Sequence, residues 1–462
     1  MTRHILILRG NLPGLITAYR LIPYGFRMTI LEPHSDFLTE TLPQPPSGTT
    51  ASRKLFSSSI LSGPSNPLIL HGFYHSTWSF LQELSLEHPF QSFEKVELEF
   101  VTSEDKTVTL PKSQWLSTLH PIIRFAFFGG LKLSDRWHLI NFLEKKREGY
   151  IPPDPNSDTL TVESWLLSAR QSAPALKEIW NPLCRFFLGC DATQASLGYF
   201  LEVLSRFWLP KSNGPEIFLG SPDMLAHLQQ KLRQVLIAKG VKVHTRNEIT
   251  RIEADTEGIQ GIVLDNGERL TADDYVSTLS PSDLLRLLPE RAPARFSCFS
   301  HLAQLHEGSG TTLQFTFHGT LLAPRLILNS GLFDWVMSQP LSAAPHPRTS
   351  ITGINLTNSS PPARTDEWLR DIAWTHIQHL FNMSPDQSFS FCKTKVIQSD
   401  YTFFPSQAGL RTFRPIPNTP IPNLFLAGPW TATQLPPCLE STVRSAYTCA
   451  RAVSEWVQAS SR

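Results

Sequence analysis

Residues 423–446 hold a combination that few folds need: a short apolar run, a glycine turn and an amphipathic segment. The run is Leu424–Ala427, the turn lies at Gly428, and a helix is expected from about Glu440. A short apolar run bounded by turn signals predicts a strand that is buried on both faces. The helix that follows would close over whatever binds at the end of that strand. We therefore expect this segment to return to the first strand of the chain, so that the two ends meet at one site.

The first 32 residues supply a matching strand–helix–strand unit. His4–Leu8 is a second short apolar run and forms the first expected strand. Arg27–Leu31 forms the second expected strand, which ends at Glu32. Pro13 suits the first turn of the helix between them, and Gly25 ends that helix. Glu32 lies about 20 residues beyond the turn, where a carboxylate can accept hydrogen bonds from a ribose. The expected helix carries apolar residues on one face: Leu15, Ala18 and Leu21.

The turn of this unit lacks two of the usual glycines. In the pattern G-x-G-x-x-G, Arg9 and Asn11 occupy the first two glycine positions, Gly14 occupies the third, and Gly10 stands between the first two. A side chain at the second position keeps the backbone away from a pyrophosphate, although Asn tolerates left-handed dihedral angles. The segment thus favours a Rossmann-type unit, and two interpretations stay open: the unit binds a dinucleotide, or it binds nothing.

Composition excludes several function classes. The chain has 462 residues, enough for two substantial domains, and a net charge of +1 with no basic cluster, so we expect no nucleic-acid partner. Its six cysteines show no C-x-x-C spacing, which indicates neither a zinc site nor a disulfide framework. The apolar runs are too short for a signal peptide or a bilayer span. We expect a reduced, cytoplasmic protein.

The rest of the chain alternates loops, helices and strands. Residues 39–67 are rich in Ser, Thr and Pro and predict a surface excursion. Leu116–Leu133 is the most hydrophobic stretch, and it fits either a segment that dips into a membrane surface or a buried core helix. Helices are expected over Phe73–Leu84, 135–210, Ser221–Lys239 and Asp366–Phe381. Strands are expected over 96–110 and 241–281, with a hairpin turn at Asp265–Gly267.

Several segments now form a familiar pattern. The strongest are Asn423–Ala446, Gly240–Pro281, and Tyr401–Phe403 followed by Arg414, Pro415 and Thr419; Trp180–Leu183 and Gly72–Tyr74 add to them. Together they resemble the flavin-containing amine oxidase and phytoene desaturase superfamily. Within it the chain is most similar to the squalene-associated FAD-dependent desaturases, the hydroxysqualene dehydroxylases of hopanoid biosynthesis. For Arg414, a surface loop residue is the alternative interpretation.

The resemblance implies an α/β fold in which a Rossmann-like FAD-binding domain is interleaved with a mixed α+β substrate domain. The FAD-binding domain would comprise residues 1–75, 215–285 and 415–462, and the substrate domain residues 76–214 and 286–414.

The chain departs from the family at positions that approach the cofactor. Pro429 stands where the family has an Asp that contacts the ribityl or phosphate part of the flavin, and Gln434 stands where it has Gly. Ser441 and Thr442 replace Gly-Ala, and Ala446 replaces Gly. After Glu32 the family's Gly-Gly-Arg element is missing, with Ser52-Arg53 as its nearest remnant, and Pro64–Pro67 replaces a polar cluster. The apolar residues of the strands and helices persist. This suggests either a relaxed flavin site in a maintained fold or a cofactor held in an altered pose.

The resemblance also implies roles for single residues if FAD binds. Gly10, Leu12 and Gly14 would carry the pyrophosphate at a helix N-terminus. Glu32 would hold the adenosine ribose, and Ile249 would lie against the adenine. The isoalloxazine and ribityl end would meet Gly428, Trp430, Thr431 and Leu435.

The implied reaction is hydride delivery to an allylic carbon of a C30 isoprenoid alcohol as its hydroxyl leaves, which gives squalene. Catalytic residues are not assigned. His71, Asp334 and Tyr401 are candidates for the acid that protonates the hydroxyl, each with a structural role as the alternative.

Two functional interpretations compete. The first is an FAD-dependent oxidoreductase that acts on an apolar isoprenoid, with peripheral membrane contact and neighbouring squalene-pathway enzymes as partners. The second is a non-catalytic relative that binds an isoprenoid or a partner protein. A true amine oxidase is a weaker third, because no cysteine for a covalent flavin link and no aromatic cage are identifiable.

Overall fold

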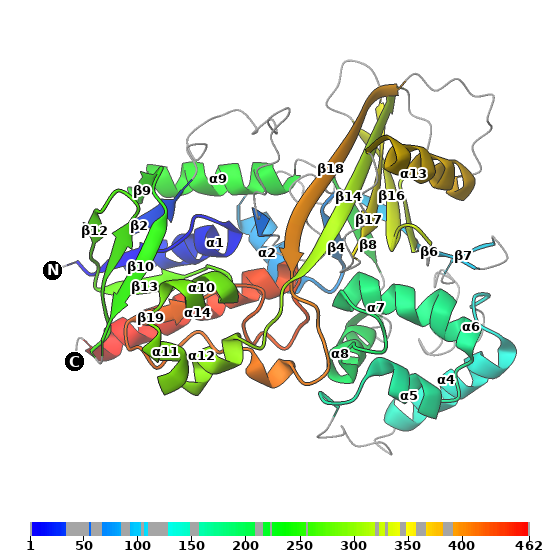
Figure 1. Cartoon of the computed structure of the whole chain (residues 1–462), viewed down its shortest axis with the longest axis horizontal. Coiled ribbons are helices and arrows are strands. Elements are labelled where there is room, and N and C mark those ends of the chain that lie inside the picture. Colours follow the sequence, from blue (N-terminus) through cyan, green and yellow to red (C-terminus); the bar gives the residue numbers. More distant parts are fainter. Residues whose placement is uncertain are drawn as a thin grey trace.

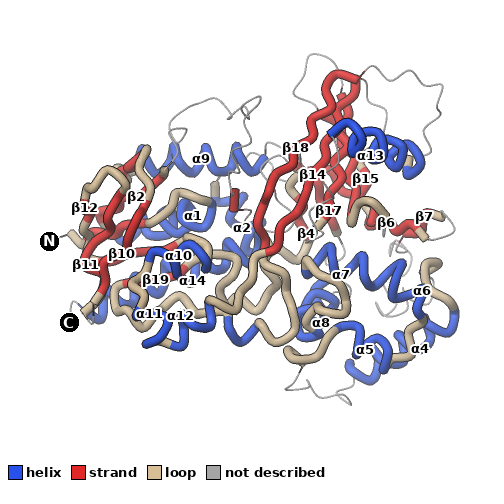
Figure 2. The backbone as a smooth tube through the Cα atoms, viewed as in Figure 1, coloured by secondary structure: helices blue, strands red, loops and turns tan. Residues whose placement is uncertain are grey.

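The computed structural model describes residues 2–33, 55–56, 67–84, 93–102, 106–109, 128–147, 157–207, 216–221, 224–255, 257–318, 323–328, 331–341, 348–356, 366–381 and 391–460. A parallel sheet with its helices forms one side of the molecule, and a long mixed sheet with a group of helices below it forms the other (Figure 1). The backbone coloured by secondary structure shows the same division of the strands (Figure 2).

A five-stranded parallel sheet holds both ends of the chain. Its strands are, in spatial order, β19 (Leu424–Leu426), β13 (Asp274–Ser277), β1 (His4–Ile7), β2 (Arg27–Glu32) and β9 (Lys242–Thr245). β13 pairs with β1 on one side and with β19 on the other. The three central strands are almost wholly buried, as expected when helices cover both faces. The structure confirms the α/β class and the meeting of the two chain ends.

Three helices pack around the first strand–helix–strand unit. α1 (Leu12–Leu21) lies between α9 (Met224–Ala238) and α14 (Leu439–Ser460), and α14 also packs on α2 (His75–Glu83) (Figure 1). α1 is followed by a 3₁₀ turn, Ile22–Tyr24, which ends at Gly25 with φ of 70°. That left-handed conformation is where glycine is favoured, so the predicted stop at Gly25 is confirmed.

A second, three-stranded sheet extends this side of the molecule. β10 (Ile249–Ala254), β11 (Ile259–Leu264) and β12 (Arg269–Leu270) form an antiparallel meander, with the predicted hairpin turn at Asp265–Gly267. After β13, Ser280 caps α10 (Pro281–Leu287) by accepting a hydrogen bond from the Asp283 amide. Two short helices follow, α11 (Arg291–Arg295) and α12 (Ser297–Leu302).

The other side of the molecule is built on an eight-stranded sheet. Its strands are, in order, β3 (Leu55–Phe56), β18 (Phe391–Phe403), β14 (Gly308–His318), β17 (Arg348–Asn355), β16 (Trp335–Leu341), β15 (Arg325–Leu328), β6 (Leu98–Val101) and β7 (Thr107–Thr109). α13 (Asp366–Leu380) packs its apolar residues Ala373, Ile377 and Leu380 against this sheet. The predicted hairpin corresponds to β6 and β7, which pair antiparallel.

A small antiparallel sheet and a helical group complete the fold. The sheet has the order β4 (Ile69–His71), β8 (Ile217–Gly220) and β5 (Phe93–Val96). The helices are α4 (Leu133–Arg147), α5 (Val162–Ser168), α6 (Ala173–Ala175), a π-helical turn at Leu176–Trp180, α7 (Asn181–Leu188) and α8 (Leu197–Phe207).

Some predictions fall outside what the structure describes. Most of the hydrophobic stretch Leu116–Leu133 lies outside the described residues, as do Ser52-Arg53 and Pro64–Asn66. The domain boundaries stay a prediction. Among the helices that are described, none is long and apolar enough to cross a bilayer.

Candidate functional site

The carboxyl ends of three neighbouring strands enclose one cavity. It has a volume of about 50 Å³. Its walls come from the starts of α1 and α9, from the ends of β13 and β18, and from the turn after β19. The lining residues are Asn11–Pro13, Leu225, Gln229, Thr278–Ser280, Phe404, Pro429 and Trp430. In open α/β sheets, ligands bind outside the carboxyl ends of the strands. This cavity is therefore the place where the two chain ends form a common site, which we call the cradle.

Asn11 bridges the cradle from one wall to the other. Its Nδ2 donates to the carbonyl of Thr278 at 2.8 Å, and its Oδ1 accepts from the amide of Gly14 at 3.3 Å. Thr278 returns a hydrogen bond from Oγ1 to the carbonyl of Arg9 at 3.1 Å. The side chain of Asn11 thus caps α1 and ties the first turn to the end of β13. It satisfies an amide that a helix N-terminus otherwise offers to an anion.

The retained glycines have separate roles in the turn. A Cβ on Gly14 would collide with the carbonyl oxygen of Arg9, so only glycine allows α1 to approach the turn this closely. The Gly10 amide donates to the carbonyl of Leu31 at 2.9 Å, which ties the turn to β2. Leu12 is buried at the start of α1 and lines the cradle. Of the three residues expected at the pyrophosphate, Leu12 lines the cradle, and Gly10 and Gly14 shape the turn beside it; their contacts with a pyrophosphate stay a prediction.

The two residues expected at the adenosine end lie farther along the same side of the molecule. Glu32 is buried at the carboxyl end of β2, and its backbone carbonyl accepts from the Arg246 amide at 3.2 Å. Ile249 begins β10 and packs against the apolar cluster that also contains Leu279, Phe404 and Trp430 of the cradle. Neither residue lines the cradle, and their contacts with a nucleotide stay a prediction.

The turn after β19 is held together by its own hydroxyl groups. The Gly428 amide donates to Ser445 Oγ at 2.9 Å, and Thr431 Oγ1 lies 2.7 Å from the same oxygen. Thr431 Oγ1 also donates to the carbonyl of Gly428 at 3.0 Å. The indole of Trp430 folds back so far that a Cβ on Gly428 would approach its Nε1 to 2.6 Å. Thr431 therefore faces its own turn, and Pro429 and Trp430 are the residues of this turn that line the cradle.

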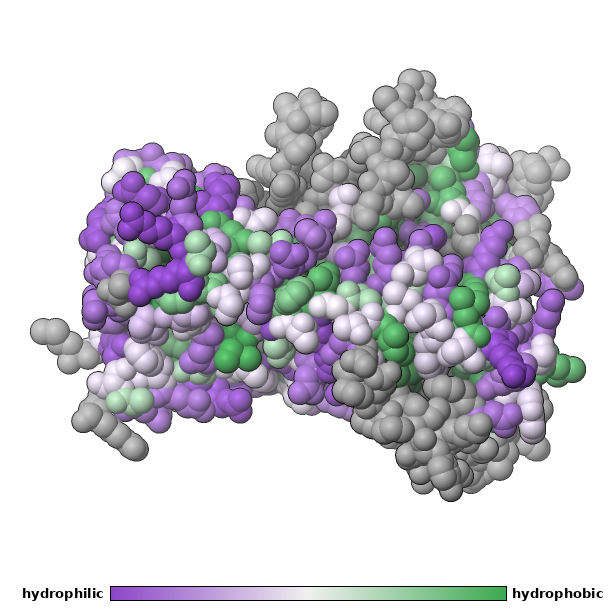
Figure 3. Space-filling model, turned by 60° about the horizontal axis from the view of Figure 1, so that its bottom comes forward, coloured by the Kyte–Doolittle hydropathy of each residue, from purple (hydrophilic) through white to green (hydrophobic). Residues whose placement is uncertain are grey.

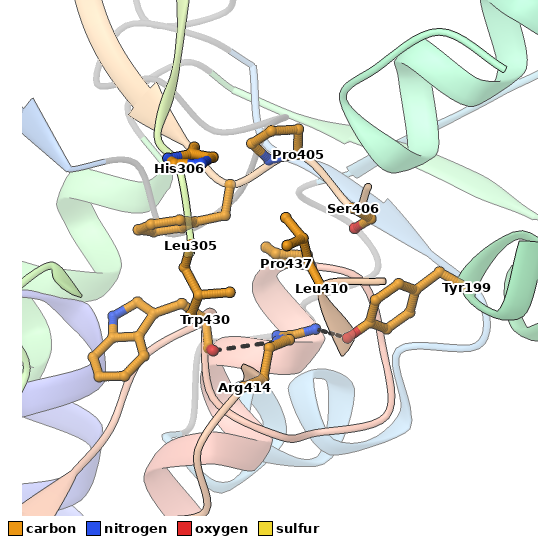
Figure 4. Close-up of a pocket in the computed structure, with 10 residues that line it drawn as sticks. Tyr199, Leu305, His306, Pro405, Ser406, Leu410, Arg414, Trp430 and Pro437 are labelled. Atoms are coloured by element: carbon orange, nitrogen blue, oxygen red, sulfur yellow. Dashed lines mark hydrogen bonds between the residues drawn. The ribbon is translucent and has the colours of Figure 1, made fainter. Parts of the chain in front are cut away.

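Arg414 holds this turn in place by hydrogen bonds to its backbone carbonyls. Its Nε donates to the carbonyl of Trp430 at 3.2 Å, and its Nη1 donates to Tyr199 Oη at 2.5 Å (Figure 4). Nη1 also donates to the carbonyl of Leu435 at 2.6 Å. Its Nη2 donates to the carbonyl of Pro429 and to Ser441 Oγ. All five N–H groups of the guanidinium thus have acceptors.

Arg414 is only 7% exposed. The interpretation of Arg414 as a surface loop residue is therefore wrong. The sequence missed this role because most of the acceptors are backbone carbonyls, which leave no mark on residue type.

Gln434 adopts a conformation that glycine favours. Its φ is 64°, its side chain is exposed, and it stands where the resembling family has Gly. A non-glycine residue in this region costs about 1–2 kcal/mol. Replacing Gln434 with Gly should raise the free energy of unfolding by about 0.5–1 kcal/mol, because the greater freedom of glycine in the unfolded chain cancels part of the gain. Chemical denaturation measures the change. Gln434→Ala is the control and should give no gain, since its Cβ meets the same strain.

The three candidate acids have different surroundings in the structure. His71 is fully buried, and burial lowers its pKa to about 3, so its ring is neutral and is a poor acid near neutral pH. Asp334 is buried, bonded by Arg185 Nη1 at 2.8 Å and by the Leu356 amide at 2.6 Å, and it fits the structural alternative. The side chain of Tyr401 lies outside the described part of the chain. Neither His71 nor Asp334 lines the cradle.

The fit of a dinucleotide to the cradle depends on Asn11. The parallel sheet, the glycine-tight start of α1 and the turn after β19 form the frame that a dinucleotide requires, but the Asn11 amide lies across the position where the resemblance to the family predicts the phosphate. Turning it aside breaks two neutral hydrogen bonds, worth about 1 kcal/mol each. A dinucleotide is far larger than a cavity of about 50 Å³, so the residues present fit it only if Asn11 turns aside and the cradle opens, which weakens its affinity.

Comparison with known proteins agrees with a fold that binds a dinucleotide. The model of the family described as flavin-containing amine oxidoreductase matches residues 66–454, a stretch that begins after the N-terminal turn. Zeta-carotene desaturase of Synechocystis sp. is 23% identical over 327 residues, which cover 64% of this chain and 66% of that protein. The 15-cis-phytoene desaturase of an Oncidium hybrid cultivar is 26% identical over 318 residues, 64% of this chain and 52% of that protein. The matches thus span between about half and two-thirds of these relatives.

The fold has solved counterparts. Cyclohexylamine oxidase from Brevibacterium oxydans superposes with a TM-score of 0.64 at 16% identity, covering 99% of both chains. An oxidoreductase from Methanosarcina mazei gives a TM-score of 0.63 at 15% identity, covering 98% of this chain and 100% of that one. At such identities the likeness concerns the fold, which it supports over nearly the whole length. Since the family model covers most of the residues, the chain belongs to the flavin-containing amine oxidoreductase family.

Proposed function

We propose that the protein is an FAD-dependent oxidoreductase that acts on a long-chain isoprenoid, and that its reaction is the reductive dehydroxylation of hydroxysqualene to squalene in hopanoid and terpenoid biosynthesis. The observation that carries the proposal is the cradle, in which Asn11–Pro13, Thr278–Ser280 and Pro429-Trp430 meet at the carboxyl ends of β1, β13 and β19. The relatives named for zeta-carotene and phytoene support an isoprenoid substrate. The resemblance to hydroxysqualene dehydroxylases supports the reaction.

The cofactor would be held mainly by the two chain ends. Gly10, Leu12 and Gly14 would hold the pyrophosphate, and Glu32 and Ile249 the adenosine. At the other end, the flavin would meet Gly428, Trp430, Thr431 and Leu435. When bound and reduced by an external two-electron donor, FAD would supply the hydride that replaces the hydroxyl of the substrate, and the hydroxyl would leave with a proton as water.

The chain's own residues would shape the reaction site and exclude water from it. Trp430 and Phe404 are buried apolar walls of the cradle, and both also line a second small cavity beside Arg414. Arg414 fixes the carbonyls of Pro429, Trp430 and Leu435, so the turn that would face the flavin is rigid before any ligand arrives. An apolar, preorganised wall excludes water from a hydride transfer.

The direct test is a turnover assay on the full-length protein. Protein incubated with excess FAD and reduced anaerobically with dithionite should convert added hydroxysqualene to squalene, detected by gas chromatography with mass spectrometry. Samples without FAD or without protein are the controls. If the protein takes up FAD and leaves hydroxysqualene intact, the assigned reaction is wrong. If it takes up no FAD at any concentration, the oxidoreductase assignment is wrong as well.

One observation favours a second candidate, a non-catalytic relative that binds an isoprenoid or a partner protein. Asn11 lies where the resemblance to the family predicts the phosphate, and Ser441, in place of the family's Gly, bonds the carbonyl of Pro429, while Thr431 and Ser445 bond each other. The polar groups of such a cradle have hydrogen-bond partners within the protein and need no ligand. The FAD uptake measured in the same assay separates the two candidates.

Membrane contact and pathway partners also belong to the proposal. The face shown in Figure 3 has hydrophobic residues scattered among hydrophilic ones. Large exposed apolar side chains do occur at the far end of the molecule from the cradle, on α4 and α5 and just before α5: Leu133, Trp137, Leu160 and Leu167. A peripheral contact there would let an apolar substrate enter from a bilayer, and neighbouring squalene-pathway enzymes would deliver it.

A further inference from the structure

Trp430 separates two small cavities. The cradle has a volume of about 50 Å³, and the cavity beside Arg414 has a volume of about 20 Å³. Of the lining residues that the structure describes, only Trp430 and Phe404 border both. Sites for small molecules have volumes of about 300–1,000 Å³, so neither cavity holds a three-ring system as it stands. A planar ligand therefore binds here only if one of these two shared walls moves.

The indole of Trp430 is held less firmly than its main chain. The carbonyl of Trp430 accepts from Arg414 Nε at 3.2 Å, and the indole points away from that bond and from Tyr199 (Figure 4). The residue is only 2% exposed, yet within the described part of the chain its N–H has no acceptor and no aromatic ring stacks on it. A buried tryptophan usually bonds its N–H. Rotation of this side chain therefore breaks no hydrogen bond, while the backbone stays fixed.

The place that the indole fills suits a flat aromatic group. Trp430 belongs to one apolar cluster with Leu279 and Phe404, and all three line the cradle. On its other side the indole lies against Gly428, where an added Cβ would approach Nε1 to 2.6 Å. The absence of a side chain at Gly428 thus makes room for a ring in this position. A planar ligand would find the same apolar contacts once the indole had left.

The cavity beside Arg414 gives the indole a direction in which to move. Two of its lining residues, Leu305 and His306, lie between α12 and β14; Leu305 is half-buried and His306 is exposed. Across the cavity, Arg414 and Tyr199 are buried and bonded to each other. The cavity thus opens toward the loop that holds Leu305 and His306, and rotation of the indole toward this loop takes it out of the cradle.

We propose that the Trp430 indole is an internal plug of the cradle, which fills the place of a flat aromatic ligand and must rotate toward Leu305 and His306 before such a ligand binds. This rests on the proposed function, in which the ligand is the isoalloxazine of FAD, and adds that the protein's own side chain closes the site until the flavin enters. A site that is open in only a fraction of the molecules binds with an apparent affinity lowered by that fraction. The plug concerns the flavin ring, whereas Asn11 concerns the phosphates.

The first test removes the plug and uses a probe without phosphates. Lumiflavin, an isoalloxazine that lacks the ribityl chain, should bind full-length Trp430→Ala at least about tenfold more tightly than the wild type, measured by quenching of its fluorescence. Cavities left by large apolar side chains bind flat apolar molecules, so added indole should compete with lumiflavin in this variant. Trp335→Ala is the matched control: Trp335 is 0% exposed and lines neither cavity, so its removal should give no gain.

The second test follows the indole in the unmutated protein. With 5-fluorotryptophan incorporated, the fluorine resonance that is lost in Trp430→Phe belongs to Trp430, and it should shift when FAD binds, while the resonance lost in Trp335→Phe should not. Binding of FAD with the Trp430 resonance unmoved would overturn the plug.

The two tests also separate the plug from the proposed reaction. If Trp430→Ala does not fold, Trp430→Leu takes its place with a gain in the same direction. No gain in lumiflavin binding, or an equal gain in Trp335→Ala, would overturn the plug, and turnover of hydroxysqualene by the wild type would then leave the proposed function intact. A gain restricted to the Trp430 variant supports the plug even if the wild type turns over no hydroxysqualene.

Discussion

Replacing Arg414 with methionine should lower the free energy of unfolding by about 3–4 kcal/mol, measured by urea denaturation. The guanidinium makes five hydrogen bonds that link the loop before β19 to the turn after that strand, to α8 and to the start of α14. Methionine fills much of the volume of the arginine side chain and donates no hydrogen bond. The carbonyls of Pro429, Trp430 and Leu435 would then stay buried without their charged donor, and this loss of hydrogen bonds sets the magnitude.

Two variants test the cause of that loss. Arg414→Lys keeps the charge with three donors in a different geometry, so it should recover part of the stability and not all of it. Arg411→Met is the matched control: Arg411 also lies over the Tyr199 ring, at 5.3 Å, but its ion pair with Asp158 is partly exposed, and its loss should cost at most about 1 kcal/mol. Equal losses for Arg411→Met and Arg414→Met would show that the buried carbonyl contacts of Arg414 do not carry the effect.

The first strand–helix–strand unit could be predicted from sequence because local features specify it. The apolar runs of β1 and β2 require burial on both faces, Pro13 and Asn11 suit a helix start, and Gly25 adopts the left-handed stop. The same holds for the hairpin at Asp265–Gly267. Each of these signals lies within the element that it predicts.

The eight-stranded sheet could not be predicted in the same way. Leu98 in β6 pairs in parallel with Leu326 in β15. No sequence signal near either residue predicts that these two strands pair. Arg414 and His71 show the same limit at the level of side chains. The acceptors of Arg414 include backbone carbonyls 15, 16 and 21 residues farther on, and the rings around His71 come from three separate elements. Which residue becomes buried among which neighbours is decided by tertiary packing.

The departures from the family pattern were the most informative part of the sequence at the candidate site. Gln434, in place of Gly, has the positive φ that a glycine would adopt. Asn11, in place of Gly, spans the cradle. Ser441, also in place of Gly, bonds the carbonyl of Pro429. Only Gln434 keeps a glycine-type conformation; Asn11 has an ordinary extended backbone with φ of −74° and Ser441 lies within α14, and their side chains bond within the protein. This explains how the fold persists although residues near the cofactor position have changed.

The affinity for FAD should respond strongly to residue 11. Asn11→Gly should bind FAD about tenfold to thirtyfold more tightly than the wild type, because no side chain then has to leave the phosphate position and two hydrogen bonds no longer compete. Asn11→Asp keeps the size and places a negative charge where the pyrophosphate would lie, so it should bind FAD more weakly than the wild type. Quenching of flavin fluorescence on titration gives the three dissociation constants. The expected order of affinity is Gly, then Asn, then Asp.

A control at a different helix separates this effect from a general loosening of the fold. Thr161 caps α5 by accepting from the Ser164 amide at 3.2 Å, far from the cradle, so Thr161→Gly removes a comparable cap and should leave FAD affinity unchanged. Adding Pro429→Asp to Asn11→Gly restores the acidic residue of the family at the ribityl end, and the double variant should bind more tightly than Asn11→Gly alone. Equal affinity of the Asp, Asn and Gly forms would mean that no pyrophosphate lies at the start of α1. The meeting of the chain ends would then be a feature of the fold without a dinucleotide to bind.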